Sequence, residues 1–234
     1  MLSDIVDVLE MRNNLINFFF LGFSLILVSK NLYCQNLVVH VGCNYGNQFA
    51  FKSEDPHVSN EFEWGAGYSF GVSLNDFQFK SKHNYTFYLG FESFGGEFYS
   101  AYSGLGGGSL KSGNFQKYVI DFEFYPWKIS AFKKLSFSPG FEINGTVGKN
   151  VRGTYSQYQM GTSIPTVDLK DFKGVIGPLN IGTNFNLSYE FKHNRISVYP
   201  SYKFSIFFLP ELNLNTYTFS HRHSFLISLG YALK

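Results

Sequence analysis

The chain has 234 residues, a length that fits one domain. Its formal net charge is +2, so it lacks the strong excess of positive charge that would favour a nucleic-acid partner. Aromatic residues make up 20% of the chain and charged residues 15%, below the roughly 25% that is typical of soluble domains. Beyond the N-terminal region, no apolar run approaches the roughly 20 residues of a membrane-spanning helix. The composition therefore argues against a polytopic helical membrane protein.

The N-terminal region is typical of a secretory signal peptide. After Met11 come the cation Arg12, an apolar run over residues 15–28 and then polar residues. The ten residues before Met11 are acidic and unlike the start of a signal peptide, which suggests that translation begins at Met11. The alternative is an uncleaved anchor, for which the apolar run is short.

Cys34 raises the question of a lipoprotein, but bulky Tyr33 stands where a lipobox has a small residue. Simple cleavage after Cys34 is therefore expected. This assigns residues 1–34 to a leader and 35–234 to the folded part. Cys43 is then the only mature cysteine, which excludes an intramolecular disulfide.

Eight later segments alternate between apolar and polar residues with a period of two, as strands with two different faces do. In the second segment, Phe62, Trp64 and the alternate residues to Leu74 form an apolar face, opposite glycines and serines. The segments are residues 37–45, 62–74, 85–93, 118–125, 135–147, 179–191, 196–208 and 224–233.

The polar face of these segments carries mainly Gly, Ser and Asn. A soluble β-sandwich also alternates, but its solvent face should carry many Lys, Glu and Thr. Small polar residues suit the crowded interior of a small barrel, and segments of about ten residues match tilted strands that cross a membrane. The sequence therefore predicts an eight-stranded antiparallel up-and-down transmembrane β-barrel, located in the outer membrane of a Gram-negative cell.

The connections alternate between long and short, as in outer-membrane barrels with long surface loops and short periplasmic turns. Trp64 and Trp127 fall near strand ends, where interfacial aromatic residues are preferred. A glycine-rich stretch at 104–108 is predicted to be a flexible exposed loop. The long links are 47–61, 94–116, 149–178 and 210–222, and the short ones are 75–84, 127–134 and 192–195.

Charged residues on the polar face are expected to point into the barrel. Buried charges must be paired or hydrated, and His40 and Lys203 are the candidate partners. We interpret the set as a polar plug, because eight strands leave little room for a channel. A proton or ion path and paired catalytic carboxylates are the alternatives. The acidic residues are Glu63, Glu92, Asp121, Glu123, Glu142 and Glu190.

Two histidine motifs offer other chemistry. His57 and Ser59 are similar to the His-x-Ser signature of outer-membrane lipid A deacylases, in which a histidine activates a serine. Here the motif falls in the first long link and lacks an assigned acidic partner. His221 and His223 alternate like metal ligands but lack a third one, which favours an interfacial rim.

The glycines of GAGYSFG lie on the polar face of the second segment. Gly65, Gly67 and Gly71 miss the GxGxxG spacing of a nucleotide-binding loop. Packing inside the barrel is therefore favoured over cofactor binding.

Four short sequence segments of the mature chain resemble the outer membrane protein beta-barrel domain family, often called PorT-like. They are VGCNYG, EFEWGAGYSFGVSL, KHNRISVYPSYKF and RHSFLISLGYALK, and the likeness spans nearly the whole mature chain. The resemblance implies a barrel that is inserted by the outer-membrane assembly machinery, with no catalytic residues to carry over.

Together these observations predict a non-enzymatic barrel with a plugged interior that presents four surface loops. No catalytic, cofactor-binding or metal-binding residue is assigned. The expected partners are outer-membrane lipid, the assembly machinery and an envelope or secretion protein, with no nucleic acid. The alternatives are a lipid A deacylase-like enzyme, which would require Ser59, and a narrow pore, whose conductance would depend on Glu142 or Lys203.

Overall fold

The computed structural model describes residues 36–50, 57–63, 65–78, 84–130, 132, 134–159, 162–168, 179–209 and 218–233. The leader predicted at 1–34 lies outside these residues, as does Trp64. Within the described ranges the chain forms twelve β-strands. These ranges contain no helix that is long and apolar enough to cross a membrane.

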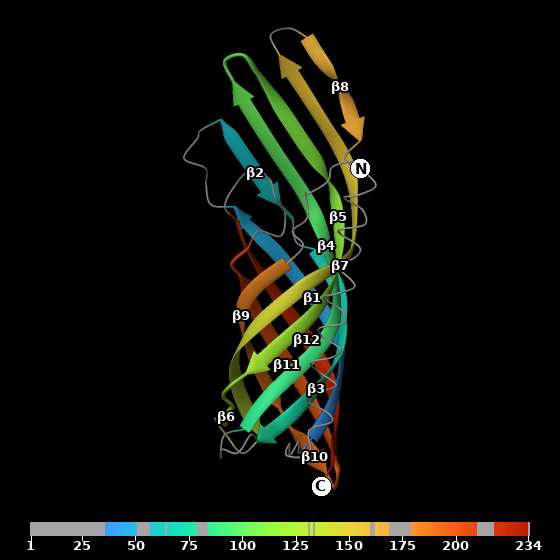
Figure 1. Ribbon diagram of the computed structural model, residues 1–234, viewed down its shortest axis with the longest axis vertical. Coiled ribbons are helices and arrows are strands. Elements are labelled where there is room, and N and C mark those ends of the chain that lie inside the picture. The colour runs from blue at the N-terminus through green and yellow to red at the C-terminus, as the bar shows by residue number, and fades with distance from the viewer. Residues whose placement is uncertain are drawn as a thin grey trace, which may run out of the picture.

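Eight of the strands form a closed antiparallel ring, which occupies the lower half of Figure 1. Each strand of the ring pairs with the next one along the chain, and the last pairs with the first from Asn36↔Ala232 to Ala50↔Thr218. The predicted eight-stranded antiparallel barrel is therefore confirmed. The strands are β1 (Asn36–Ala50), β3 (Gly65–Gln78), β4 (Asn84–Gly104), β5 (Gly107–Tyr125), β7 (Leu135–Gln159), β9 (Leu179–Tyr189), β11 (Ile196–Phe207) and β12 (Thr218–Ala232).

Four short strands attach to the ring strands. At the end of the barrel that carries the short connections, here called the turn end, β6 (Ile129–Ser130) pairs with β7, and β10 (Phe191–His193) pairs with β11. Toward the opposite end, β2 (Val58–Phe62) pairs with β4 and β8 (Thr162–Asp168) pairs with β7.

Three ring strands continue far beyond the barrel. Pairing of β4 with β3 ends at Ser93, and pairing of β7 with β9 ends at Gly145, yet both strands run on together with β5. We call this extension the wing: β2, β8 and residues 94–104, 107–117 and 148–159. Figure 1 shows the wing rising above the barrel rim.

The wing corrects several sequence predictions. The link predicted at 94–116 is a β-hairpin whose turn is Leu105–Gly106, and the glycines around it lie mostly in strands. Much of the link predicted at 149–178 is also strand, and β12 begins at Thr218 within the link predicted at 210–222. The second predicted segment is divided, because Phe62 ends β2 and β3 starts only at Gly65.

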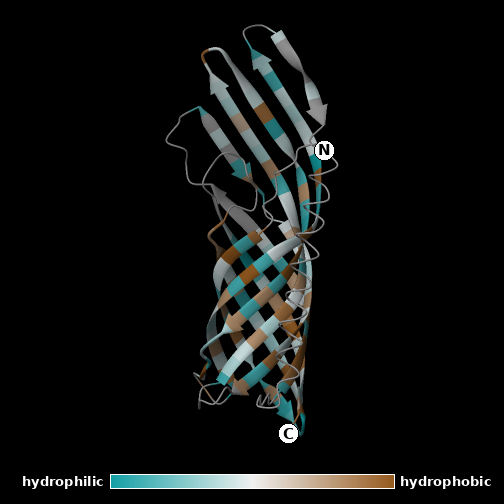
Figure 2. Cartoon of the chain, in the orientation of Figure 1, coloured by the Kyte–Doolittle hydropathy of each residue, from teal (hydrophilic) through white to brown (hydrophobic). Residues whose placement is uncertain are grey.

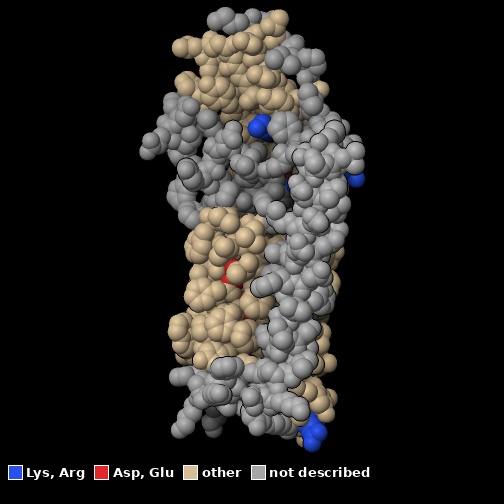
Figure 3. Space-filling model, in the orientation of Figure 1, with Lys and Arg blue, Asp and Glu red and all other residues tan. Residues whose placement is uncertain are grey.

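The barrel wall has an apolar outer face and a polar inner face. Val41, Phe70, Phe141 and Ile227 project outward with 61%, 51%, 54% and 66% of their surface exposed, respectively. On the inner face, serines, asparagines and charged residues are almost fully buried. Brown bands mark the apolar residues of the wall in Figure 2, and charged atoms are scarce on its described surface in Figure 3. A wall of this kind suits hydrocarbon rather than water.

Aromatic pairs link neighbouring strands on the outer face. Phe70 and Phe91 stack with ring centroids 5.1 Å apart, and Phe185 and Phe204 stack at 5.6 Å. Such cross-strand pairs stabilise the register of the sheet.

Glycines on the inner face allow close approach of neighbouring backbones. A Cβ atom on Gly67 would lie 1.6 Å from the carbonyl oxygen of Ser93 on β4. The glycines of GAGYSFG are thus explained by strand packing.

Candidate functional site in the barrel interior

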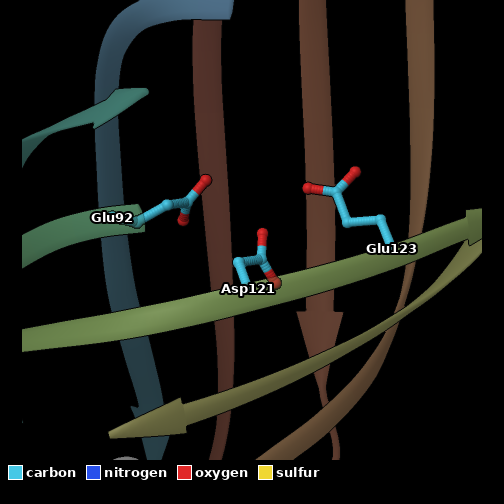
Figure 4. A group of neighbouring side chains, drawn as sticks. All are labelled: Glu92, Asp121 and Glu123. Carbon is cyan, nitrogen blue, oxygen red and sulfur yellow. The ribbon is translucent and has the colours of Figure 1, made fainter. Parts of the chain in front are cut away.

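Four carboxyl groups meet in the middle of the barrel, and each of the four residues has only 0–2% of its surface exposed. Glu92 comes from β4, Asp121 and Glu123 come from β5, and Glu142 comes from β7. Inner-face positions alternate along each strand, which is why Asp121 and Glu123 both point inward. Figure 4 shows the side chains of Glu92, Asp121 and Glu123 converging from their strands.

Lys203 of β11 reaches into the centre of this group. Its Nζ donates hydrogen bonds to Glu123 Oε1 at 2.5 Å, Glu92 Oε1 at 3.0 Å and Asp121 Oδ2 at 3.3 Å. Glu142 Oε2 lies 3.8 Å from the same nitrogen. The lysine predicted as a partner of the interior acids therefore holds all four of them together.

Arg222 of β12 supplies a second cation. Its guanidinium donates to Glu92, and its Nη1 lies 3.5 Å from Glu142 Oε1. The guanidinium carbon also lies over the rings of Phe94 and Phe207, 4.2 and 4.6 Å from their centroids. The arginine therefore pairs with carboxyl groups through its charge and packs against two aromatic rings through the face of its guanidinium.

Glu142 has polar support beyond the two cations. Its Oε2 accepts hydrogen bonds from Ser205 Oγ at 2.6 Å and from Asn184 Nδ2 at 3.3 Å. Glu123 similarly accepts a hydrogen bond from the Tyr125 hydroxyl. We call the four carboxyl groups together with Lys203 and Arg222 the lumen cluster.

His40 lies toward the turn end, held between two serines. Its Nε2 is 2.7 Å from Ser73 Oγ and its Nδ1 is 2.7 Å from Ser228 Oγ. Its ring also meets the ring of Tyr88 edge to face, with centroids 5.2 Å apart. Since both ring nitrogens are engaged, His40 is a well-packed core residue beside the lumen cluster.

A cavity of about 50 Å³ runs from the turn end to this region. Its lining extends from Lys128 and Asn75 at the turn end to His40, Tyr88 and Glu123 inside. A volume of this size holds a few water molecules at about 10–15 Å³ each. Water can therefore reach the edge of the lumen cluster from the turn end.

Two acidic residues of the predicted set lie elsewhere. The prediction that Glu63 points inward is wrong, because Glu63 is exposed in the short link between β2 and β3. The alternation that suggested an inward position breaks where the segment divides. Glu190 is partly buried near the turn end and accepts hydrogen bonds from Ser197 Oγ at 3.0 Å and Tyr199 OH at 3.1 Å.

The histidine motifs also lie outside the lumen cluster. His57 and Ser59 are exposed at the start of β2, in the wing rather than on the barrel wall. His221 and His223 occupy outer-face positions of β12, where His223 Nδ1 lies 2.5 Å from the Tyr202 hydroxyl.

The geometry of the carboxyl groups is suited to holding a cation. Glu92, Asp121 and Glu123 each offer an oxygen, and these atoms lie within 4.8 Å of one another. The Lys203 ammonium already lies in hydrogen-bond contact with all three residues. The ion pairs of the lumen cluster therefore link side chains of β4, β5, β7, β11 and β12 across the barrel interior.

A closed antiparallel ring with an apolar wall and a charged, filled interior defines the class of small transmembrane β-barrels. Solved structures of such proteins are similar to this chain at low identity. Neisserial surface protein A (NspA) is 9% identical, with 87% of this chain and 100% of that chain covered and a TM-score of 0.44. Ail, the attachment invasion locus protein of Yersinia pestis, is 7% identical, with 85% and 100% covered and a TM-score of 0.37. The outer membrane protease OmpT from Escherichia coli is 8% identical, with 88% and 99% covered and a TM-score of 0.33.

No family model matches the chain, and no curated protein matches it. The resemblance to the PorT-like family is therefore not confirmed by these comparisons.

Proposed function

We propose that this chain is an integral, non-enzymatic protein of the bacterial outer membrane whose barrel anchors the wing at the cell surface for contact with a partner. The observation that carries the proposal is the continuity of the wing with the barrel. β4, β5 and β7 each continue from the ring into the wing as a single strand, with one register shift in the pairing of β5 with β7 between Tyr118 and Val119, so the membrane-embedded wall fixes the position of the wing. A binding surface built on strands is more rigid than one built on loops.

The composition of the wing supports a role in recognition. Its strands are rich in Tyr, Ser, Gly and Asn, the residues that antibody binding loops favour. Tyr99, Tyr102 and Tyr158 are 40%, 47% and 51% exposed, and Leu105 at the hairpin turn is fully exposed. Tyrosines held on a sheet offer large contact areas at a low cost in conformational entropy.

The filled interior supports anchoring rather than transport. The lumen cluster joins side chains from five of the ring strands, and its members are almost fully buried. An ion that crossed the barrel would have to disrupt these pairs. We extend the proposal in three ways. The chain is a member of the PorT-like family, the outer-membrane assembly machinery inserts it, and its partner is an envelope or secretion protein.

The orientation of the wing can be tested by cysteine labelling on intact cells. In a Cys43→Ser background, Leu105→Cys should react with a membrane-impermeant maleimide, because Leu105 forms the tip of the wing hairpin. The matched control is Lys128→Cys at the turn end, which should react only after the outer membrane is permeabilised. Labelling of Lys128→Cys on intact cells with protection of Leu105→Cys would refute the proposed orientation.

A further inference from the structure

The two faces of the wing differ in charge. The positions of β4 and β5 that face the barrel interior continue into the wing with the same pairing, and they form what we call the inner face of the wing. Lys111 and buried Lys117 lie on this face of β5, and Lys149 of β7 lies opposite Lys117. The acidic residues of the described wing strands lie on the other face, and they are Glu61, Glu97 and Asp168.

A β-bulge brings Lys149 to the inner face. The pairing of β5 with β7 shifts register between Tyr118 and Val119, so inner-face positions of β7 have even numbers as far as Thr146 and odd numbers from Lys149 onward. The shift places Lys149 directly opposite Lys117, and like charges that face each other across two strands repel. A negatively charged group bound beside this pair would relieve the repulsion.

The inner face presents two basic positions with an apolar patch between them. Toward the tip of the wing, Lys111 Nζ lies 5.6 Å from the centroid of the Tyr155 ring. Toward the barrel rim, Lys149 is exposed, and it lies about 20 Å from Lys111 at about 3.3 Å per strand residue. Phe115 and Val151 pair with each other between these lysines and are half-buried. The order along the face is therefore basic, apolar and basic.

We propose that the inner face of the wing binds an acidic segment of the protein partner, in which acidic side chains about 20 Å apart flank an apolar one. This inference rests on the proposed display of the wing at the cell surface and names the chemistry of its partner.

Two features of the wing favour a polypeptide over other anions. The outer face of the wing continues the lipid-facing wall, whereas the inner face continues the barrel interior, so a partner on the inner face is a water-soluble chain rather than an anionic lipid. The pair of Phe115 and Val151 suits an apolar side chain of a protein segment, which an acidic polysaccharide does not have.

The test measures binding of a fluorescent peptide to the mature chain refolded in zwitterionic detergent at low salt. In the peptide, two Glu-Glu pairs flank a central Leu-Phe pair. Fluorescence anisotropy should show that it binds more tightly than the same peptide with Gln in place of Glu, and that added salt weakens its binding. Lys149→Glu should weaken the binding about fivefold or more, because it replaces an attraction by a repulsion. Lys149→Gln, which adds no negative charge, should cause a smaller loss.

The matched control is Arg152→Glu. Arg152 is exposed on the outer face of the same strand, and its replacement makes the same change in net charge, so it should alter the affinity by less than about twofold. Equal losses for K149E and R152E would indicate unspecific attraction and overturn the proposal.

Sodium polygalacturonate tests the other class of partner. If this acidic polysaccharide bound as tightly as the peptide and lost affinity equally in K149E, the partner would not be a protein segment. Absence of binding by the Glu peptide would also overturn the proposal. Because purified chain is used, either result leaves the orientation of the wing to be decided by the cysteine labelling on cells.

Discussion

Replacing Lys203 by methionine should lower the free energy of unfolding of the barrel by about 3–5 kcal/mol. Methionine keeps much of the side-chain volume but removes the ammonium that contacts Glu92, Asp121 and Glu123. The loss is large because uncompensated carboxylates then remain in a buried setting. Urea titration of the refolded barrel in detergent, followed by tryptophan fluorescence, would measure the change.

Lys192→Met is the matched control for this prediction. Lys192 is exposed in β10 at the turn end, so its replacement should change the free energy of unfolding by less than about 0.5 kcal/mol. If K203M were as stable as K192M, the lumen cluster would not contribute to holding the barrel together.

An arginine in the middle of the outer face should be nearly as damaging. Ile227 projects from β12 with 66% of its surface exposed, between the equally apolar Phe225 and Leu229. Ile227→Arg should cost about 2–4 kcal/mol, because the guanidinium would face hydrocarbon near the bilayer midplane. Reversible unfolding from lipid vesicles would measure this cost.

Two further substitutions test whether the cost depends on depth. Leu233→Arg, close to the end of β12, should cost no more than about 1 kcal/mol, and Ser103→Arg in the wing should be near neutral. Equal costs at all three positions would contradict a lipid-facing wall.

The ring could be predicted from the sequence because each of its strands has one apolar and one small polar face. In β9, for example, outward Ile181, Phe185 and Leu187 alternate with buried Asn180 and Asn184. That contrast is expected where one face meets lipid and the other meets the interior of a small barrel. The number of ring strands and the approximate position of each therefore followed from periodicity.

The wing could not be predicted in the same way. Beyond the barrel rim both faces of a strand are free to be polar, so stretches such as Ser109–Gly113 in β5 show no period-two contrast and resemble a loop. What makes them strands is pairing with distant segments, such as β5 with β7 from Gly107↔Gln159 onward. Pairing of this kind leaves little trace in local composition.

The lumen cluster was predicted in part. The alternation of faces placed Glu142 and Lys203 inside the barrel from two clearly alternating segments. It placed Glu92, Asp121 and Glu123 there from two segments, residues 85–93 and 118–125, whose alternation is weaker, and all five residues are buried. The alternation of faces did not reveal which of these side chains contact one another, because those contacts depend on strand register and side-chain length. Arg222 was missed because it was assigned to a link, although its even spacing from Ser224 and Ser228 places it on the same inner face.

The most direct test of a closed membrane barrel is heat modifiability on a gel. Mature protein refolded in detergent should migrate faster before boiling than after, because the closed ring of strands resists unfolding by the gel detergent. The folded form should also resist protease within the barrel wall. Identical migration before and after boiling, together with high solubility without detergent, would contradict the barrel and favour a secreted β-sandwich.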